Sequence, residues 1–219
     1  MKCVFAVILG LLGLPGAALA QTPVAVVEDV QGKVTGAEFM DYVAPGQVIK
    51  LGAGGKVVLG YMKSCARETI AGIGTIIVGK EQSAVHLADY QVDKVACDVG
   101  QAEKIGREVS ESAATVVRSL KEERPAPLVL YGTSPVVMTG ERGKLVVERL
   151  DAKGERHEVE LTASSLTRGR FYDFAKANTA LQPGGTYAAT LKSKRVVFQI
   201  DAKAGPGAGP VIGRLVSLR

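Results

Sequence analysis

Short apolar segments rich in β-branched residues alternate with glycine turns along the first part of the chain. Between residues 24 and 98 these segments are VAVVEDVQGKV, QVIKLG, KVVLGYM, ETIAGIGTIIVG and SAVHLA. Glycines or a Pro-Gly pair interrupt the pattern at positions 32, 36, 45–46, 52–55 and 79. Segments of this composition are typical of strands, and regularly spaced turns favour an all-β unit. We therefore predict a compact β domain over residues 24–98.

The hydrophobic period changes at residue 99. Over residues 99–124 apolar side chains recur at steps of three and four, which predicts an amphipathic helix that connects two domains. The apolar positions are Ala102, Ile105, Val109, Ala113, Val116, Val117 and Leu120. Pro125 and Pro127 end the helix. Because an isolated helix of this length is only marginally stable in water, we expect its apolar stripe to pack on its own chain or, alternatively, on a partner, including a second copy in a homodimer.

Strand character returns over residues 127–203. The apolar runs PLVLYG, PVVMTG, KLVVERLD, ERHEVEL and KRVVFQID are separated by turn-like sequences, which predicts a second, β-sandwich-like domain. Residues 171–181 are compatible with a short helix before the Pro183 turn. Residues 204–219 combine a Gly/Pro hinge with a last apolar segment, 211–218, that we expect to return as an edge strand. The predicted fold class is mainly β: two β domains joined by a helix.

The first 20 residues have the three parts of a secretory signal peptide. Lys2 supplies a positive start, Val4 to Leu14 form a short apolar core, and Ala18 and Ala20 are the small residues of a cleavage site. The apolar run is shorter than the roughly 20 residues of a spanning helix. A short buried helix is the alternative. We predict cleavage after Ala20 and a location in the bacterial periplasm or outside the cell, without stable membrane insertion.

Export changes the interpretation of the cysteines. Cys3 leaves with the signal peptide, so the mature chain keeps Cys65 and Cys97 in a compartment that permits disulfides. We predict one bridge closing a loop of about 33 residues. Free thiols are one alternative. A metal ligand or a catalytic thiol is another, although the sequence has no Cys-x-x-Cys motif and only two histidines.

The charge is mildly basic and evenly spread. The formal net charge is +5 for the full chain, and loss of Lys2 lowers it to +4. Nucleic-acid-binding proteins concentrate basic residues in stripes with aromatic residues between them, which is not the pattern here. We therefore expect no nucleic-acid partner.

Several motifs of the first domain resemble the FecR-type periplasmic β domain. They are a Gly-x-Val start at 32–34, a Pro-Gly turn into a strand at 45–49, a Gly-x-Gly-Gly-x-Val-x-Leu step at 52–59, and a threonine-containing strand that ends near a glycine. The resemblance implies a narrow β stack with glycine corners. FecR regulators also carry a cytoplasmic segment and a membrane helix, whereas this chain has a signal peptide. We therefore expect a secreted domain of this shape rather than iron-dependent signalling.

The second domain resembles an immunoglobulin-like sandwich near its end. The sequence LQPGGTYAATL, followed by VVFQID, is similar to the turn that precedes a late strand of such domains. The resemblance implies that Tyr187 is a buried corner tyrosine whose hydroxyl is bonded to backbone.

Chemical motifs are sparse. We find no nucleophile elbow, no zinc-protease helix and no Walker loop, so we expect no catalytic, cofactor-binding or metal-binding residues. His86 and His157 fit strand or surface positions. The neighbouring acids Glu28–Asp29 and Asp89–Asp93 are acid/base candidates by proximity alone.

The polar set Lys63, Arg67 and Glu68 surrounds Cys65. A disulfide would hold this segment rigid, and rigid loops with protruding charges make recognition surfaces. Solvated ion pairs on a surface strand are the alternative interpretation. Basic residues also gather at 167–170 and 191–195.

These observations favour a non-catalytic, exported binding or structural protein of the cell envelope, with an envelope protein or a glycan as partner. Two other functions remain open. One is a component of a periplasmic signalling system, and the other is a hydrolase whose acidic site residues are dispersed along the chain.

Overall fold

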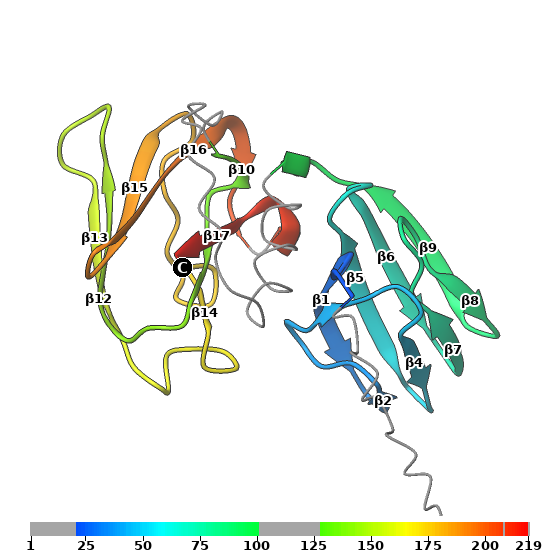
Figure 1. Ribbon diagram of the computed structural model, residues 1–219. Coiled ribbons are helices and arrows are strands. Elements are labelled where there is room, and N and C mark those ends of the chain that lie inside the picture. The colour runs from blue at the N-terminus through cyan, green and yellow to red at the C-terminus, as the bar shows by residue number, and fades with distance from the viewer. Residues whose placement is uncertain (1–20, 101–127, 208, 219) are drawn as a thin grey trace, which may run out of the picture.

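The protein folds into two β units that pack on one another (Figure 1). The computed structural model describes residues 21–100, 128–207 and 209–218. We call residues 21–100 the N-terminal unit and the other described residues the C-terminal unit. The prediction of a mainly β fold is confirmed, because the regular elements of the described residues are strands and one short 3-10 helix.

The N-terminal unit contains two antiparallel sheets. Its strands are β1 (Ala25–Gln31), β2 (Val34–Thr35), β3 (Tyr42–Val43), β4 (Val48–Leu51), β5 (Lys56–Tyr61), β6 (Ala66–Ala71), β7 (Gly74–Ile77), β8 (Ala84–His86) and β9 (Asp89–Lys94). One sheet has the order β3-β1-β5-β6-β9 and the other the order β2-β4-β7-β8. Alternating apolar residues from both sheets, such as Val57, Leu59, Ile49 and Ile76, fill the core between them.

The C-terminal unit also has two sheets. Its elements are β10 (Leu128–Gly132), β11 (Val136–Thr139), β12 (Gly143–Arg149), β13 (Arg156–Leu161), β14 (Phe171–Asp173), β15 (Thr186–Leu191), β16 (Lys194–Gly205), the 3-10 helix η1 (Val211–Gly213) and β17 (Leu215–Leu218). The sheet orders are β10-β16-β15-β12-β13 and β14-β11-β17. Two pairs, β10 with β16 and β11 with β17, are parallel.

The last segment of the chain returns to the C-terminal unit, as the sequence predicted. β17 pairs with β11 at the edge of the smaller sheet, and all four of its residues are buried. The short helix proposed for residues 171–181 is wrong: β14 is followed by turns, in which Asn178 has a positive φ. The predicted signal peptide and the predicted helix over 99–124 lie outside the described residues, apart from Val99 and Gly100.

Tyr187 is fully buried and stacks on Phe198. Its hydroxyl accepts the backbone N–H of Gln182 at 2.9 Å, and it lies 2.6 Å from Glu155 Oε2, to which it donates. The burial and the backbone bond agree with the sequence prediction. The carboxylate partner is new, because Glu155 comes from the β12–β13 turn, 32 positions away.

The two units share an apolar interface. The N-terminal unit contributes Val26, Met40 and Met62, and the C-terminal unit contributes Val136, Met138, Phe171, Val211, Ile212 and Leu215. These side chains form one buried cluster that is separate from the two cores. Burial of apolar surface therefore holds the units together.

Candidate functional site at the interface between the units

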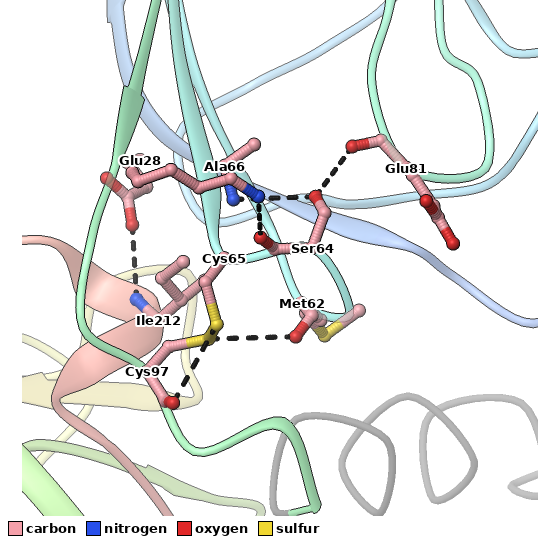
Figure 2. Close-up of a disulfide and its surroundings, with 9 residues drawn as sticks. Glu28, Met62, Ser64, Cys65, Ala66, Glu81, Cys97 and Ile212 are labelled. Atoms are coloured by element: carbon pink, nitrogen blue, oxygen red, sulfur yellow. Dashed lines mark hydrogen bonds between the residues drawn. A yellow bond between two sulfur atoms is a disulfide. The ribbon is translucent and has the colours of Figure 1, made fainter.

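Cys65 and Cys97 form the predicted disulfide, with their Cα atoms 5.8 Å apart (Figure 2). Cys65 lies in the turn before β6, and Cys97 follows β9, the strand that pairs with β6. The bridge therefore closes the β5–β6 turn onto the end of the sheet. Cys97 also packs against the apolar cluster at the interface.

The turn beside the bridge is held by further hydrogen bonds. Ser64 Oγ donates to the carbonyl of Glu81 at 2.6 Å, and Lys94 Nζ donates to the carbonyl of Ser64 at 2.7 Å. Lys63 projects to solvent and lies 3.5 Å from Glu81 Oε1, with both side chains more than half exposed. The loop is therefore fixed in shape, and its charges are accessible.

The carboxylate of Glu28 lies at the interface, with its side chain only 2% exposed. Oε2 accepts a hydrogen bond from Arg67 Nε at 2.8 Å. Oε1 accepts the backbone N–H of Ile212 at 3.1 Å, the bond drawn from Glu28 in Figure 2. Ile212 belongs to the C-terminal unit, 184 positions away. One buried carboxylate thus bonds to both units.

A β-bulge and a glycine create the space for Glu28. The register of β1 with β5 shifts between Val27 and Asp29, so Glu28 is the extra residue of a bulge. On β5, a Cβ at Gly60 would lie 2.7 Å from Glu28 Oε1 and 2.8 Å from Ile212 Cγ2. Only glycine at position 60 lets the carboxylate and the isoleucine approach the sheet together.

We expect Glu28→Gln to lower the free energy of unfolding by about 2–3 kcal/mol, because an amide leaves the Arg67 guanidinium without its anion at a buried contact. Urea unfolding of the oxidised protein measures the change. Asp29→Asn is the matched control: it removes the same charge from the neighbouring residue, whose carboxylate accepts a hydrogen bond from the exposed Gln31 at 2.7 Å. Equal losses in the two variants would contradict the role of Glu28.

A second polar contact joins the units at the rim of the interface. Arg168 Nη1 lies 2.5 Å from Asp41 Oδ1, and Nη2 lies 3.1 Å from Glu38 Oε2. A depression of about 280 Å³ lies here. It is lined by Met40, Asp41, Tyr42, Arg168, Arg170 and Phe171. Exposed charge of both signs beside aromatic rings gives this rim the composition of a polar binding surface.

The recognition surface predicted for Lys63, Arg67 and Glu68 stays a prediction, but the exposure that it requires is wrong for Glu68. Lys63 is exposed, and Arg67 is half-buried against Glu28. Glu68 is fully buried, because alternation along β6 places Ala66, Glu68 and Ile70 on the inner face of the sheet. Glu68 is therefore not part of an exposed surface.

Glu68 instead anchors a buried polar network. Its Oε1 accepts the backbone N–H of Ser83 at 2.9 Å and the hydroxyl of Tyr90 at 2.7 Å, while Oε2 is buried without a hydrogen bond. Ser83 Oγ lies 2.9 Å from the Tyr61 hydroxyl. Burial raises the pKa of Tyr61 to about 12, and burial together with the nearby Glu68 also raises the pKa of Tyr90. Both phenols stay protonated and act as hydrogen-bond donors or acceptors.

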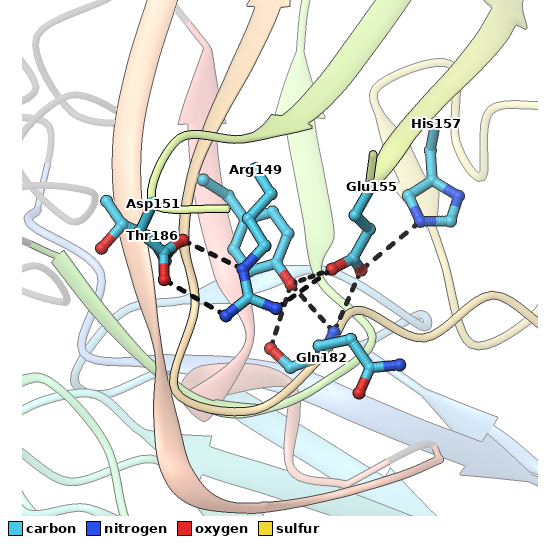
Figure 3. Close-up of polar contacts among 7 residues, drawn as sticks. Arg149, Asp151, Glu155, His157, Gln182 and Thr186 are labelled. Carbon is cyan, nitrogen blue, oxygen red and sulfur yellow. Dashed lines mark hydrogen bonds and ion pairs between the residues drawn. The ribbon is translucent and has the colours of Figure 1, made fainter. Parts of the chain in front are cut away.

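A second network lies at the β12–β13 turn of the C-terminal unit (Figure 3). Arg149 makes two hydrogen bonds to Asp151, at 3.0 and 3.1 Å, and its guanidinium lies over the Tyr187 ring. Glu155 accepts the Tyr187 hydroxyl and the backbone N–H of Gln182. The network fixes the turn onto the corner tyrosine.

The pKa of Asp151 is lowered to about 2, first by the hydrogen bonds from Arg149 and then by the backbone N–H of Thr186. A lowered pKa in the folded state means that Asp151 stabilises the fold above about pH 3.8, and that this contribution disappears as the pH falls towards 2. Carboxyl-carbon NMR should show Asp151 titrating near pH 2. In Arg149→Met the midpoint should rise, and an unchanged midpoint would contradict the assignment to Arg149.

The histidines and the second acidic pair that the sequence offers as candidate site residues do not come together in one site. His86 is exposed on β8. His157 is half-buried, with Nε2 3.7 Å from Glu155 Oε1. Asp89 and Asp93 are exposed on β9. Among residues 21–100, 128–207 and 209–218, no group of three or more His, Cys, Asp or Glu side chains is arranged to hold a metal ion.

Two residues with important contacts, Arg214 and Glu155, did not figure in the sequence prediction. Arg214 is a single charge among apolar residues of the last segment, and this isolation was the available signal. No helix of the described part of the chain is long and apolar enough to cross a membrane. No protein-family model, curated protein or solved structure matches the chain.

Proposed function

We propose that the chain is an exported, non-catalytic binding or structural protein of the cell envelope, whose N-terminal unit is a FecR-like domain. The disulfide-held β5–β6 turn is the observation that carries this proposal. A disulfide persists in oxidising compartments, and here it fixes an exposed, charged loop instead of closing a buried pocket. Fixed loops with accessible charges suit recognition of another surface.

The hydrogen bonds of the two buried glutamates, Glu28 and Glu68, support a binding function rather than a catalytic one. Glu28 bonds to Arg67 and Ile212, and Glu68 bonds to Ser83 and Tyr90. Glu28 was an acid/base candidate of the sequence, and its carboxylate is used to hold the two units in one orientation. A general acid or base needs an accessible proton path to a substrate, whereas these oxygens face the protein.

The proposed recognition surface consists of the Lys63 loop and the rim depression with Arg168 and Arg170. Both present positive charge next to negative charge: Lys63 lies beside Glu81 of the β7–β8 loop, and Arg168 lies beside Asp41 at the rim. Hydrogen-bonding groups of both kinds suit a polar envelope protein or a glycan. Weak, salt-sensitive binding is expected, because exposed charges are screened.

Export and oxidation are tested by fractionating cells that express the full chain. Mass spectrometry should find a mature chain that begins at Gln21 in the exported fraction. Without reductant, Cys65 and Cys97 should resist alkylation. A protein that keeps residues 1–20 in the cytoplasm, or that labels rapidly at either cysteine, would contradict the proposal.

Recognition is tested by crosslinking in intact cells with the wild type and the variants Lys63→Glu, Arg170→Glu and Lys203→Glu. Lys203 is an exposed lysine of β16 that does not line the rim depression, and it serves as the control. A specific envelope protein or glycan should be captured by wild type and Lys203→Glu, should be reduced about tenfold in one of the other variants, and should rebind the purified protein. Capture no greater than with an unrelated exported protein would overturn the proposal.

A further inference from the structure

The edge strand β9 is open to solvent along its whole length. It ends the five-stranded sheet of the N-terminal unit, and all six of its residues are exposed. In Figure 1, β8 and β9 lie on the side of this unit that faces away from the C-terminal unit. A long open edge is a template for pairing with another strand.

Another long edge of the described sheets is protected by charge. β13 carries Arg156 and Glu158, which form ion pairs with one another and with Glu148 and Lys144 of β12. Such a charged ladder resists addition of a further strand. β9 lacks this ladder in its middle, where Tyr90, Gln91 and Val92 follow one another.

The pairing of β9 with β6 determines which backbone N–H and C=O groups of β9 face the open edge. The N–H of Val95 donates to the carbonyl of Cys65 at 3.0 Å, and Ala66 to Ala71 pair antiparallel with Lys94 to Asp89. Because the bonding groups of an antiparallel strand alternate between its two sides, those of Asp89, Gln91 and Asp93 face β6. The N–H and C=O groups of Tyr90, Val92 and Lys94 therefore face the open edge.

The side chains of the same residues face the inner side of the sheet. Tyr90 lies opposite Ile70 and Val92 lies opposite Glu68, both of which are buried residues of β6. At the edge, however, Tyr90 is still 37% exposed and Val92 is 44% exposed. An added strand would cover these two side chains and also satisfy three pairs of backbone groups.

We propose that a second copy of this chain binds β9 as an antiparallel strand, with the two-fold axis at Val92. Val92 then lies opposite the partner's Val92, Tyr90 opposite the partner's Lys94, and Gln91 opposite the partner's Asp93. An apolar pair, a cation–aromatic pair and an amide–carboxylate pair result, joined by six backbone hydrogen bonds. The five-stranded sheet continues across the dimer as a ten-stranded sheet.

The charges of β9 select this register. A shift by one residue would place inner-face side chains opposite outer-face ones and is excluded by the pleat. A shift by two in one direction places Asp89 opposite the partner's Asp93, and a shift by two in the other places Asp93 opposite the partner's Asp93. Like charges directly opposite are destabilising, so among these registers only the one centred on Val92 avoids them.

Site-directed disulfide formation tests the proposal. In Val92→Cys the two introduced cysteines would have Cα atoms about 5.5 Å apart, within the range of a disulfide. In Gln91→Cys, the matched control, they lie diagonally, at about 7–8 Å. With oxidised glutathione and the full mature chain, non-reducing gels should show about tenfold more covalent dimer for Val92→Cys. Equal crosslinking of the two variants would overturn the register.

A second measurement determines the molar mass of the protein in solution, and therefore its oligomeric state. Light scattering over a concentration series should show a dimer for the wild type, and Val92→Pro should weaken it at least tenfold. Proline removes an N–H that faces the open edge and not β6, so β9 itself is retained, as circular dichroism can verify. A wild type that stays monomeric overturns the proposal. A dimer that survives Val92→Pro also overturns it and directs attention to the apolar stripe of residues 99–124.

Discussion

Replacement of Arg214 by alanine is expected to destabilise the protein by about 3–5 kcal/mol, a large part of the stability of a typical domain. The side chain is 2% exposed. Its Nε donates to the carbonyl of Gly209 at 2.9 Å, and its Nη1 donates to the carbonyl of Ser134 and lies 3.1 Å from Asp173 Oδ1. Alanine would remove the cation beside the buried Asp173 carboxylate, which would keep the backbone N–H of Ala175 at 3.0 Å. It would also take the Arg214 donors from two carbonyls and leave a cavity.

The surroundings of Arg214 explain why another cation should not substitute fully. The stem of the side chain lies against Gly132, where a Cβ would be 2.6 Å from Arg214 Cδ. The planar guanidinium reaches three acceptors in different directions, which a single ammonium group cannot do. Arg214→Lys should therefore lose an intermediate amount of stability.

Urea unfolding followed by circular dichroism measures both variants. Arg195→Ala is the matched control, because Arg195 is exposed on β16, and it should change the stability by no more than about 0.5 kcal/mol. If the unfolding free energy of Arg214→Ala lies within about 1 kcal/mol of that of Arg195→Ala, the buried contacts of Arg214 contribute little, and β17 is held by its apolar residues and its pairing with β11.

The contrast between Cys65 and Arg214 shows what the sequence could predict. The disulfide followed from counting, because the predicted cleavage after Ala20 would leave only two cysteines. Strands followed from local apolar runs and glycine turns. Arg214 lies in a segment that the sequence identified as a final strand, but its acceptors Ser134 and Asp173 are 80 and 41 positions away. No local period carries that information.

The burial of Glu68 and the burial of Glu28 were not predicted from the sequence, for different reasons. The period of two along β6 places Glu68 with Ala66 and Ile70, so its burial was readable from the strand and was missed because the residue is charged. Glu28 gave no such signal. Its burial depends on a bulge in β1, on the missing side chain of Gly60 and on a unit that begins about 100 residues later. Only the packing of the two units reveals it.

Removal of the disulfide is expected to lower the free energy of unfolding by roughly 3–4 kcal/mol, the loop-closure entropy of a 32-residue separation. The single variants Cys65→Ser and Cys97→Ser and the double variant should lose about the same amount, because each opens the same loop once. Urea unfolding of oxidised wild type and of the three variants measures this. A double variant with twice the loss of each single one would instead indicate separate packing roles for the two sulfurs.

Combining the double cysteine variant with Glu28→Gln distinguishes two effects of the disulfide: restriction of the unfolded chain and positioning of the two units. If the bridge restricts the unfolded chain, its loss adds to that of Glu28→Gln to within about 0.5 kcal/mol, because the two changes act on different states. Cys97 packs on the interface cluster, and Glu28 bonds to Ile212 of the same cluster. A coupling above about 1 kcal/mol would therefore mean that the bridge also positions the two units. We expect additivity, since the hydrogen bond of Glu28 to Ile212 requires neither sulfur.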